Sequence, residues 1–274
     1  MQSGVLMLEM QTCYVSEVGG RSRNEDACGY WTSDTGCCWV VSDGAGGHGS
    51  GDVASRLVVS TVLRRFAAQP RVEPDAASAL LQGANDVVVD EKTNGSTSDD
   101  MHATAVLLLI DPRDGFAVWG HVGDSRIYLF RRGRVAYQTR DHSLVQNMID
   151  AGYGSADMIR THPQRSLLTS AIGSTDAISL SVSAEPLVLQ AGDVFLLCTD
   201  GWWEYVEESD MERLLDETPN PQAWLDSMAG LIRSRAPTEH DNYTAVCVRM
   251  ADQADAEETT VILLPKSRQG TGDN

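Results

Sequence analysis

The sequence lacks any apolar run long enough to cross a lipid bilayer. It has 274 residues, of which 42% are hydrophobic, yet no apolar stretch approaches the ~20 residues that a membrane-spanning helix needs. Its first residues also lack the basic stretch followed by an apolar core that marks a secretory signal peptide. We therefore expect a cytoplasmic protein without membrane partners, whose length allows one large folded domain.

Cysteines are few and show no paired spacing. The six cysteines are Cys13, Cys28, Cys37, Cys38, Cys198 and Cys247, mostly within apolar runs, and no two of them form a CxxC pair. Paired spacings would indicate a structural zinc site, and a short secreted chain with many cysteines would indicate a disulfide framework. We expect neither, because cysteines within apolar runs are typical of buried reduced thiols.

Basic residues are scarce as well. The chain has 21 Lys and Arg against 39 Asp and Glu, which gives a formal net charge of −18 at pH 7. This balance argues against a nucleic-acid partner, because nonspecific binding depends on a basic face that neutralises phosphates. Most of the acidic residues are expected on the solvated surface, where they favour solubility.

Four aspartates share one setting, the end of a short apolar run beside a tight turn. They are Asp43 after CCWVVS, Asp124 after VWGHVG, Asp200 after VFLLCT and Asp241 before NYTAVCV. A run buried on both faces indicates a central strand, so these carboxylates should gather on the rim of a sheet. There they repel one another unless cations intervene, and an all-oxygen cluster suits hard ions such as Mg²⁺ or Mn²⁺. Such ions polarise phosphoryl oxygens and activate water, so the pattern predicts a metal-dependent hydrolase.

Hydrophobic periodicity predicts strands and helices in mixed order. Strands are predicted at 5–18, 36–42, 102–110, 116–122, 126–130, 134–138, 178–189, 193–199 and 242–250, and helices at 51–66, 75–92, 209–217 and 221–235. Between 141 and 174 the pattern changes to short helical pieces broken by glycine and proline. Residues 251–274 are polar apart from TTVILLP, which is typical of a tail with one docked strand.

Seven sequence motifs carry a resemblance to a known family. In chain order they are GGRSRNEDA, SDGAGGHGSGDVAS, GDSRIYLF, RDHSLVQNMIDAG, HPQRSLLTSAIG, CTDGWWEYV and HDNYTAV. Together they resemble the successive motifs of the bacterial metal-dependent type 2C (PPM) Ser/Thr protein phosphatases. The resemblance implies an α+β fold, a four-layer αββα sandwich in which two central antiparallel β-sheets are flanked by pairs of helices. It also implies a catalytic domain over residues 1–250, with a flap at about 147–165, followed by the tail.

The resemblance also implies a reaction and its partners. Phosphoserine and phosphothreonine in proteins would be hydrolysed by direct attack of a metal-bridging water or hydroxide, without a covalent phosphoenzyme. The ions would be Mn²⁺ or Mg²⁺, two in the core of the site and a third bound more weakly. The substrates would be phosphorylated proteins made by a cognate Ser/Thr kinase, and the enzyme would be a monomer.

Individual residues match the family's site. The metal-binding positions are Glu25, Asp26 through a water, Asp43 as the bridging carboxylate, the Gly44 carbonyl, Asp200, Asp241, and Asp124 for the third ion, which Asp200 would share. Arg21 matches the arginine that grips the phosphate, for which a planar guanidinium fork is suited. Taken singly, each of these residues would be read as a surface charge or a turn.

Two interpretations remain open for the proton donor to the leaving oxygen. Eukaryotic relatives have a histidine directly after the Asp-Gly pair, whereas this chain has Ala45 there and His48 three residues later, as bacterial relatives do. His48 is a candidate general acid, but packing or capping near the glycine-rich turn explains it at least as well. Ala45 also replaces the methionine usual in the bacterial motif, and we expect activity to survive that change.

A dinucleotide-binding turn is the first alternative. Gly44, Gly46 and Gly49 spell GxGxxG between a predicted strand and a predicted helix. That fingerprint expects an acidic residue about 20 positions later at the end of a second strand, but Glu73 falls in a proline-flanked loop. Close backbone approach around Asp43 is the better explanation of the glycines.

A noncatalytic module that binds phosphoproteins is the second alternative. Loss of one or more metal-binding carboxylates would mark such a protein. All of the matched carboxylates are present, so the sequence favours an active enzyme.

Overall fold

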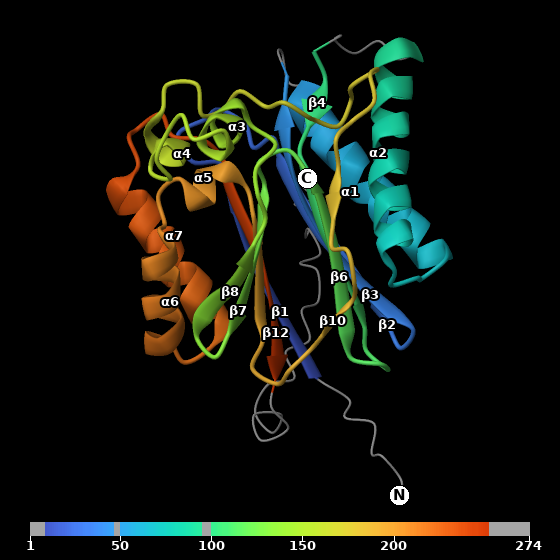
Figure 1. Cartoon of the computed structure of the whole chain (residues 1–274), viewed down its shortest axis with the longest axis vertical. Helices are drawn as coiled ribbons and strands as arrows, with labels where there is room; N and C mark the ends of the chain where they lie inside the picture. Colours follow the sequence, from blue (N-terminus) through green and yellow to red (C-terminus); the bar gives the residue numbers. More distant parts are fainter. Residues whose placement is uncertain (1–8, 47–49, 95–99, 252–274) are drawn as a thin grey trace, which may run out of the picture.

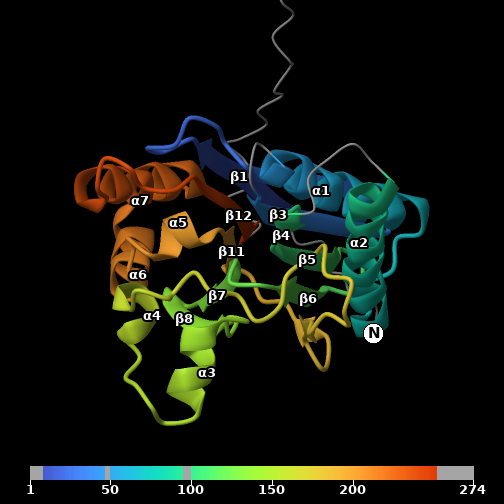
Figure 2. The same ribbon diagram turned by 90° about the horizontal axis from the view of Figure 1, so that it is seen from above.

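The computed structural model describes residues 9–46, 50–94 and 100–251. Two antiparallel β-sheets pack face to face, and helices cover both outer faces (Figure 1). Seen from above, the order is helices, sheet, sheet, helices (Figure 2). The αββα sandwich implied by the resemblance is therefore confirmed.

The first sheet has five strands in the order β1-β12-β11-β7-β8. Their bounds are Glu9–Glu17 (β1), Arg126–Arg131 (β7), Arg134–Gln138 (β8), Val194–Cys198 (β11) and Tyr243–Ala251 (β12). Because β11 and β12 are antiparallel, the end of β11 and the start of β12 meet at the same edge of the sheet. Asp200 and Asp241, which flank those strand ends, are thereby brought together.

The second sheet is built around β3. Its path is β10-β6-β5-β3-β2, with β4 beside β3 and β9 beside β6. The bounds are Asp26–Ser33 (β2), Gly36–Ala45 (β3), His102–Ala103 (β4), Ala105–Asp111 (β5), Phe116–Val122 (β6), Ser181–Val182 (β9) and Leu187–Val188 (β10).

Four long helices form the outer layers. They are α1 Ser50–Ala68 and α2 Pro74–Asn94 over the seven-stranded sheet, and α6 Glu208–Glu217 and α7 Pro221–Arg235 over the five-stranded sheet. Three short helices, α3 Leu144–Asp150, α4 Met158–Thr161 and α5 Asp200–Trp203, lie at the end of the sandwich to which β11 leads. Among the described residues, no helix has the length and apolar character to cross a membrane.

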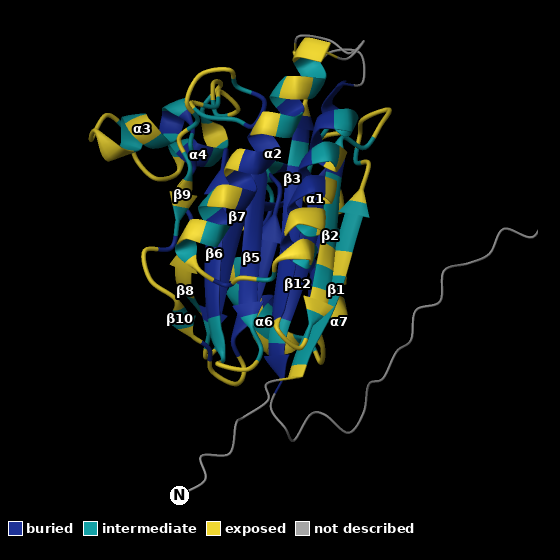
Figure 3. Cartoon of the chain, turned by 90° about the vertical axis from the view of Figure 1, so that its right-hand side faces the viewer, coloured by how far each residue is buried: buried dark blue, intermediate teal, exposed yellow. Residues whose placement is uncertain are grey.

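Strand β3 shows why continuous apolar runs become central strands. Trp39 and Val41 pack between the two sheets, whereas Cys38 and Val40 pack under α1 and α2. Alternate side chains of a strand point to opposite faces, so a strand covered on both faces must be apolar at every position. Figure 3 shows the same burial along β5 and β6. All six cysteines are free thiols.

Two strand predictions were wrong. Strand β2 was not predicted, because its sequence DACGYWTS shows neither an apolar run nor clear alternation. Conversely, the predicted strand at 178–189 contains only the two-residue strands β9 and β10. Pro186 lies between them, and proline cannot donate a backbone hydrogen bond to a neighbouring strand. The predicted strand in TTVILLP lies outside the described residues.

Candidate active site

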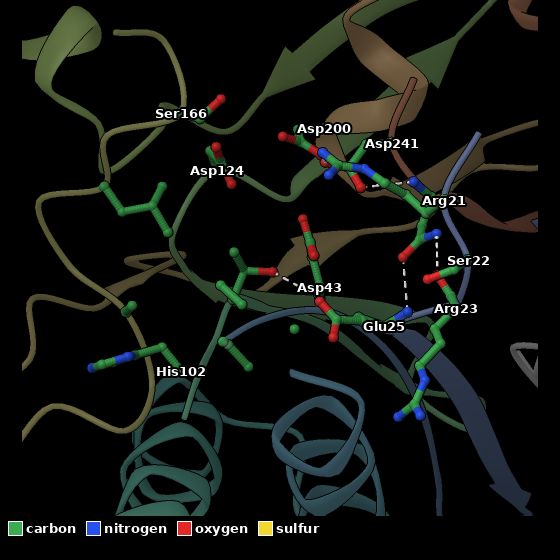
Figure 4. Close-up of a pocket in the computed structure, with 18 residues that line it drawn as sticks. Arg21, Ser22, Arg23, Glu25, Asp43, His102, Asp124, Ser166, Asp200 and Asp241 are labelled. Carbon is green, nitrogen blue, oxygen red and sulfur yellow. Dashed lines mark hydrogen bonds and ion pairs between the residues drawn. The ribbon is translucent and has the colours of Figure 1, made fainter. Parts of the chain in front are cut away.

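The strand ends open into a cavity of about 760 Å³ at one end of the sandwich. Five carboxylates line it, those of Glu25, Asp43, Asp124, Asp200 and Asp241, together with Arg21 (Figure 4). These residues are spread over more than 200 positions of the chain. The structure thus brings together the four aspartates of the strand-end pattern with Arg21 and Glu25 of the GGRSRNEDA motif.

Asp26 and Asp43 are directly opposite each other on β2 and β3. Side chains at opposed positions of an antiparallel pair lie on the same face, with Cβ atoms about 4.5–5.5 Å apart. Asp26 is buried, and Asp43 borders the cavity. The backbone N–H of Asp43 donates to Thr104 Oγ1 at 3.0 Å, and its carbonyl accepts from the Thr104 N–H at 2.8 Å. These two bonds fix the backbone of β3 at Asp43.

Glycines allow three chain segments to meet beside Glu25. A Cβ on Gly44 would lie 2.0 Å from the Gly51 carbonyl oxygen, and a Cβ on Gly51 would lie 2.9 Å from Glu25 Cδ. The close approach therefore explains why these positions are glycine. It agrees with the prediction for Gly44, and a Cβ on Gly46 would lie 2.8 Å from the Asp100 carbonyl oxygen; Gly49 lies outside the described residues. Glu73, in the connection between α1 and α2, forms an ion pair with Arg71, which leaves nothing to support a dinucleotide-binding turn.

Asp124 and Asp200 occupy turns that leave the strands. Asp124 follows β6 in a turn that contains Gly123 at φ +95°, and it is only 4% exposed. Asp200 is the first residue of α5, and a Cβ on the next residue, Gly201, would lie 2.0 Å from the Asn242 carbonyl oxygen. The tight contact at Gly201 brings Asp200 against the start of β12.

Asn242 is a site residue that the sequence reasoning missed. Its Oδ1 accepts from the Glu25 N–H at 2.7 Å, and its Nδ2 donates to the carbonyls of Val18 and Arg23 at 2.7 and 2.9 Å. One buried amide therefore holds the β1–β2 loop, which carries Arg21 and Glu25. A buried asparagine needs partners for both ends of its amide, and Asn242 finds them in this loop. In the sequence, the only signal for this role was the position of Asn242 next to Asp241.

Arg21 reaches over the carboxylates from this loop. Its Nη2 donates to Asp241 Oδ2 at 2.8 Å, and its side chain remains 55% exposed. The guanidinium thus lies at the edge of the cavity, within reach of an anion bound there (Figure 4).

Burial and mutual repulsion disfavour the ionised form of the cavity carboxylates. Burial and then the neighbouring carboxylates raise the pKa of Asp43 and of Asp200 well above its ordinary value. Burial is also the largest cause that raises the pKa of Asp26 and of Asp124, each to about 7. A bound cation would offset both burial and repulsion.

The donor set fits hard divalent ions. All candidate ligands are oxygens, which is the preference of Mg²⁺ and Mn²⁺. Asp26 Oδ1 is buried without a partner, although Asp26 Oδ2 accepts from Thr199 Oγ1 at 3.0 Å. In residues 9–46, 50–94 and 100–251, no three Asp, Glu, His or Cys side chains already stand at the spacing of metal ligands. The carboxylates thus line the cavity walls rather than converge on one point.

Two histidines bear on the search for a proton donor. His48 lies outside the described residues. His102, which the sequence reasoning missed, lines the cavity from β4, opposite Ala45 on β3. Its Nε2 lies 3.3 Å from Lys92 Nζ and its Nδ1 lies 3.3 Å from the Asp100 carbonyl. Both ring nitrogens are therefore engaged away from the carboxylates.

The segment 147–165 lies beside the cavity and is tied to α5 and α6. Arg160 Nη2 donates to both oxygens of Glu208 at 2.9 and 3.0 Å, and Arg165 Nε donates to Glu204 at 2.5 Å. Directly after it, Ser166 and Leu168 form part of the cavity wall.

Comparison with known proteins gives consistent matches. A family model described as protein phosphatase 2C matches residues 16–242. Protein phosphatase PhpP of Streptococcus pneumoniae is 27% identical over 272 residues, which cover 90% of this chain and all of PhpP. PppA, described as a key regulatory component of T6SS in Pseudomonas aeruginosa, is 33% identical with a TM-score of 0.72, covering 88% of this chain and 98% of PppA.

A third match concerns metal content. The catalytic domain of the serine/threonine protein phosphatase PstP, solved in complex with two manganese ions, has a TM-score of 0.74 at 24% identity and covers 89% of this chain and 99% of that domain. At this identity it supports the fold alone. The family match spans most of the chain and includes every residue that lines the cavity. The chain belongs to the protein phosphatase 2C family.

Proposed function

We propose that this chain hydrolyses phosphoserine and phosphothreonine in proteins, with Mn²⁺ or Mg²⁺ held by the carboxylates of the cavity. One observation carries the proposal: five carboxylates share one cavity wall beside a single arginine, Arg21, that can reach across them. The five carboxylates outnumber the arginines that line the cavity, so the site carries excess negative charge until cations bind. It then suits a phosphate dianion, which cations and a guanidinium recognise together.

Six residues would hold two core ions. They are Glu25, Asp43, the Gly44 carbonyl, Asp200 and Asp241 directly, and Asp26 through a water, in keeping with its position behind Asp43. Small side-chain rotations would bring the oxygens to ligand spacing. When bound, the ions would lower the pKa of a water toward neutrality and polarise the phosphoryl oxygens. The two manganese ions of the PstP complex are in line with this arrangement.

A third, weaker ion is proposed at Asp124, shared with Asp200. Both side chains border the same part of the cavity, as Figure 4 shows. The resemblance assigns only Asp124 and Asp200 to this ion, so fewer protein oxygens would surround it than surround the core pair.

Arg21 would orient the substrate phosphate. The guanidinium would release its ion pair with Asp241 and bind two phosphoryl oxygens instead. The Asp241 carboxylate would then be available to bind a metal ion. A planar fork matches two oxygens of one phosphoryl group and favours an in-line approach of the nucleophile. His48 stays the candidate general acid for the leaving serine or threonine oxygen.

The proposal includes a division of the chain into a catalytic domain and a tail. Residues 1–250 would form the catalytic domain, residues 147–165 within it would form a flap that contacts the substrate, and residues 251–274 would form a separate tail. The enzyme would act as a monomer on the products of a cognate Ser/Thr kinase. A cytoplasmic location is favoured because all six cysteines are free thiols.

A phosphothreonine peptide and a generic phosphoester test the function. Both should be hydrolysed with Mn²⁺ or Mg²⁺, and excess chelator should abolish turnover until the metal is restored. A phosphoprotein-binding module would instead bind the peptide without releasing phosphate. Full hydrolysis in excess chelator would refute the metal-dependent mechanism.

A further inference from the structure

The β1–β2 loop carries a second arginine that the proposed reaction does not use. Arg21 and Arg23 are the only Arg or Lys side chains among the described residues that line the cavity. Arg21 forms its ion pair with Asp241. Arg23 is exposed, and its side chain has no hydrogen-bond or ion-pair partner within the described parts of the chain. A free guanidinium therefore stands at the mouth of an acidic cavity.

The backbone beneath Arg23 is firmly placed. Its carbonyl accepts from Asn242 Nδ2 at 2.9 Å, and the Gly20 N–H donates to the His240 carbonyl at 3.0 Å. A Cβ on Gly20 would lie 2.0 Å from the Thr238 carbonyl oxygen, so the loop packs tightly against the start of β12. Because the loop backbone is already fixed, binding through Arg23 orders only its side chain and not the loop.

The two arginines serve different sides of the cavity mouth. In Figure 4 they leave the loop in different directions, Arg21 across the cavity toward Asp241 and Arg23 past Glu25, on the side of the loop away from Asp241. A phosphate held under Arg21 would leave Arg23 next to the residues that flank the phosphorylated one. Arg23 would then meet the substrate's side chains rather than its scissile phosphate.

We propose that Arg23 binds a second anionic group of the substrate, a carboxylate or phosphate on a residue flanking the phosphorylated serine or threonine. This inference rests on the proposed function. It makes Arg23 a specificity-determining residue that favours phosphosites in acidic or multiply phosphorylated sequences. A guanidinium suits both groups, since it donates paired hydrogen bonds to either.

The overall charge of the protein makes the test sensitive. A chain with a net charge of −18 repels acidic peptides in general. A preference for an acidic flank must therefore come from a local cation. For an exposed but charge-assisted contact we expect a preference of about three- to tenfold in kcat/KM, reduced by added salt.

The experiment compares peptides within each protein variant. The reference is a phosphothreonine peptide with alanine at the two positions on either side. Its variants carry a single glutamate, or a single non-hydrolysable phosphonate, at one of those positions. The ratio of kcat/KM to that of the reference peptide is internal to each variant, so a general loss of activity does not affect it.

Three substitutions complete the design. Arg23→Gln should reduce the ratio to about one at the position where wild type shows its preference. Arg23→Glu should reverse it, so that a peptide with arginine at that position becomes the better substrate. Arg113→Gln is the matched control, because it removes one exposed positive charge from the β5–β6 turn, outside the cavity lining, and should keep the wild-type ratio.

The outcomes separate this inference from the proposed function. No chelator-sensitive hydrolysis of the reference peptide would refute the proposed function itself. If that peptide is hydrolysed but no flanking anion is preferred, or if Arg23→Gln keeps the preference, the role of Arg23 is overturned. A larger ratio for the phosphonate than for glutamate identifies doubly phosphorylated sites as the substrates, and equal ratios identify acidic sites.

Discussion

Two groups of carboxylates in this protein differ in whether arginines pair with them. The first group is Asp141 and Glu208, and the second is the five carboxylates that line the cavity. In the first, Arg126 donates to both oxygens of Asp141 at 2.8 Å, with both side chains 2% exposed. Arg126 also stacks on Trp203 at 3.6 Å. In the second, the cavity group, Asp241 is the only carboxylate with an ion-pair partner among the described residues. The first group is neutralised by the protein, and the second is not.

Titration behaviour follows this difference. Burial opposes ionisation of Glu208, but Arg160 and Arg126 reverse that effect and lower its pKa. In the described parts of the chain no comparable cation faces Asp43, and burial together with four neighbouring carboxylates raises its pKa. Buried carboxylates left without a protein partner mark the place where an external cation belongs. The predictions below test that contrast.

The largest effect is expected from Asp43→Asn. The change removes charge from the position proposed to contact both core ions, so turnover of a phosphothreonine peptide should fall by about 10³-fold or more. The fold should remain, because the substitution relieves repulsion rather than breaking a pair. Asp114→Asn, on an exposed turn, is the control for the chemistry of the substitution. Near-native turnover of Asp43→Asn would remove it from the site.

Asp141→Ala should act on stability instead. It leaves the buried Arg126 without its bidentate partner, which costs about 3–5 kcal/mol when a buried pair is broken. Urea unfolding of the chelated protein measures this. Replacing both partners, Arg126→Met with Asp141→Leu, should be less harmful than Asp141→Ala alone. If Asp141→Ala is as stable as wild type, the contrast between the two groups fails.

Arg21→Ala should weaken substrate binding. A charge-assisted bidentate contact contributes about 1.5–3 kcal/mol, so KM should rise by about tenfold or more, with a smaller change in kcat. Steady-state kinetics on the reference peptide separate the two constants. An unchanged kcat/KM would exclude Arg21 from phosphate binding.

Asp124→Ala should have the smallest effect. The core ions held through Glu25, Asp43, Asp200 and Asp241 should remain, whereas the third ion should be lost and turnover should fall by about tenfold. Manganese binding and peptide turnover are measured together on the variant. Equal ion content and equal turnover would make Asp124 only a turn residue.

The sequence predicted the parts of this site that are local in the chain. Asp43 and Asp200 each follow an apolar run whose burial is plain from composition, so their place on a sheet rim could be inferred. The family motifs extended that to Glu25 and Asp26, although the strand that carries Asp26 was not predicted. Helix α7 was predicted at its observed bounds, and in the structure Asn220 caps it and Pro221 is its first residue.

The remainder depends on contacts between distant segments. The pairing of β1 with β12 explains two of these contacts. It lets Asn242 hold a loop more than 200 residues away, and it lets Arg21 pair with Asp241. No local pattern encodes that register. The same holds for Arg126 and Asp141, whose pairing distinguishes them from the cavity carboxylates but leaves no periodic signal.

Manganese binding to the chelator-treated protein tests the central claim most directly. Calorimetry on wild type, Asp43→Asn and Asp114→Asn would count the ions and measure their affinities. We predict at least two manganese ions for wild type and for Asp114→Asn, and loss of both core ions, or a large drop in their affinity, for Asp43→Asn. Undiminished binding by Asp43→Asn, or no binding by wild type, would contradict the claim that the unpaired carboxylates of the cavity form the metal site.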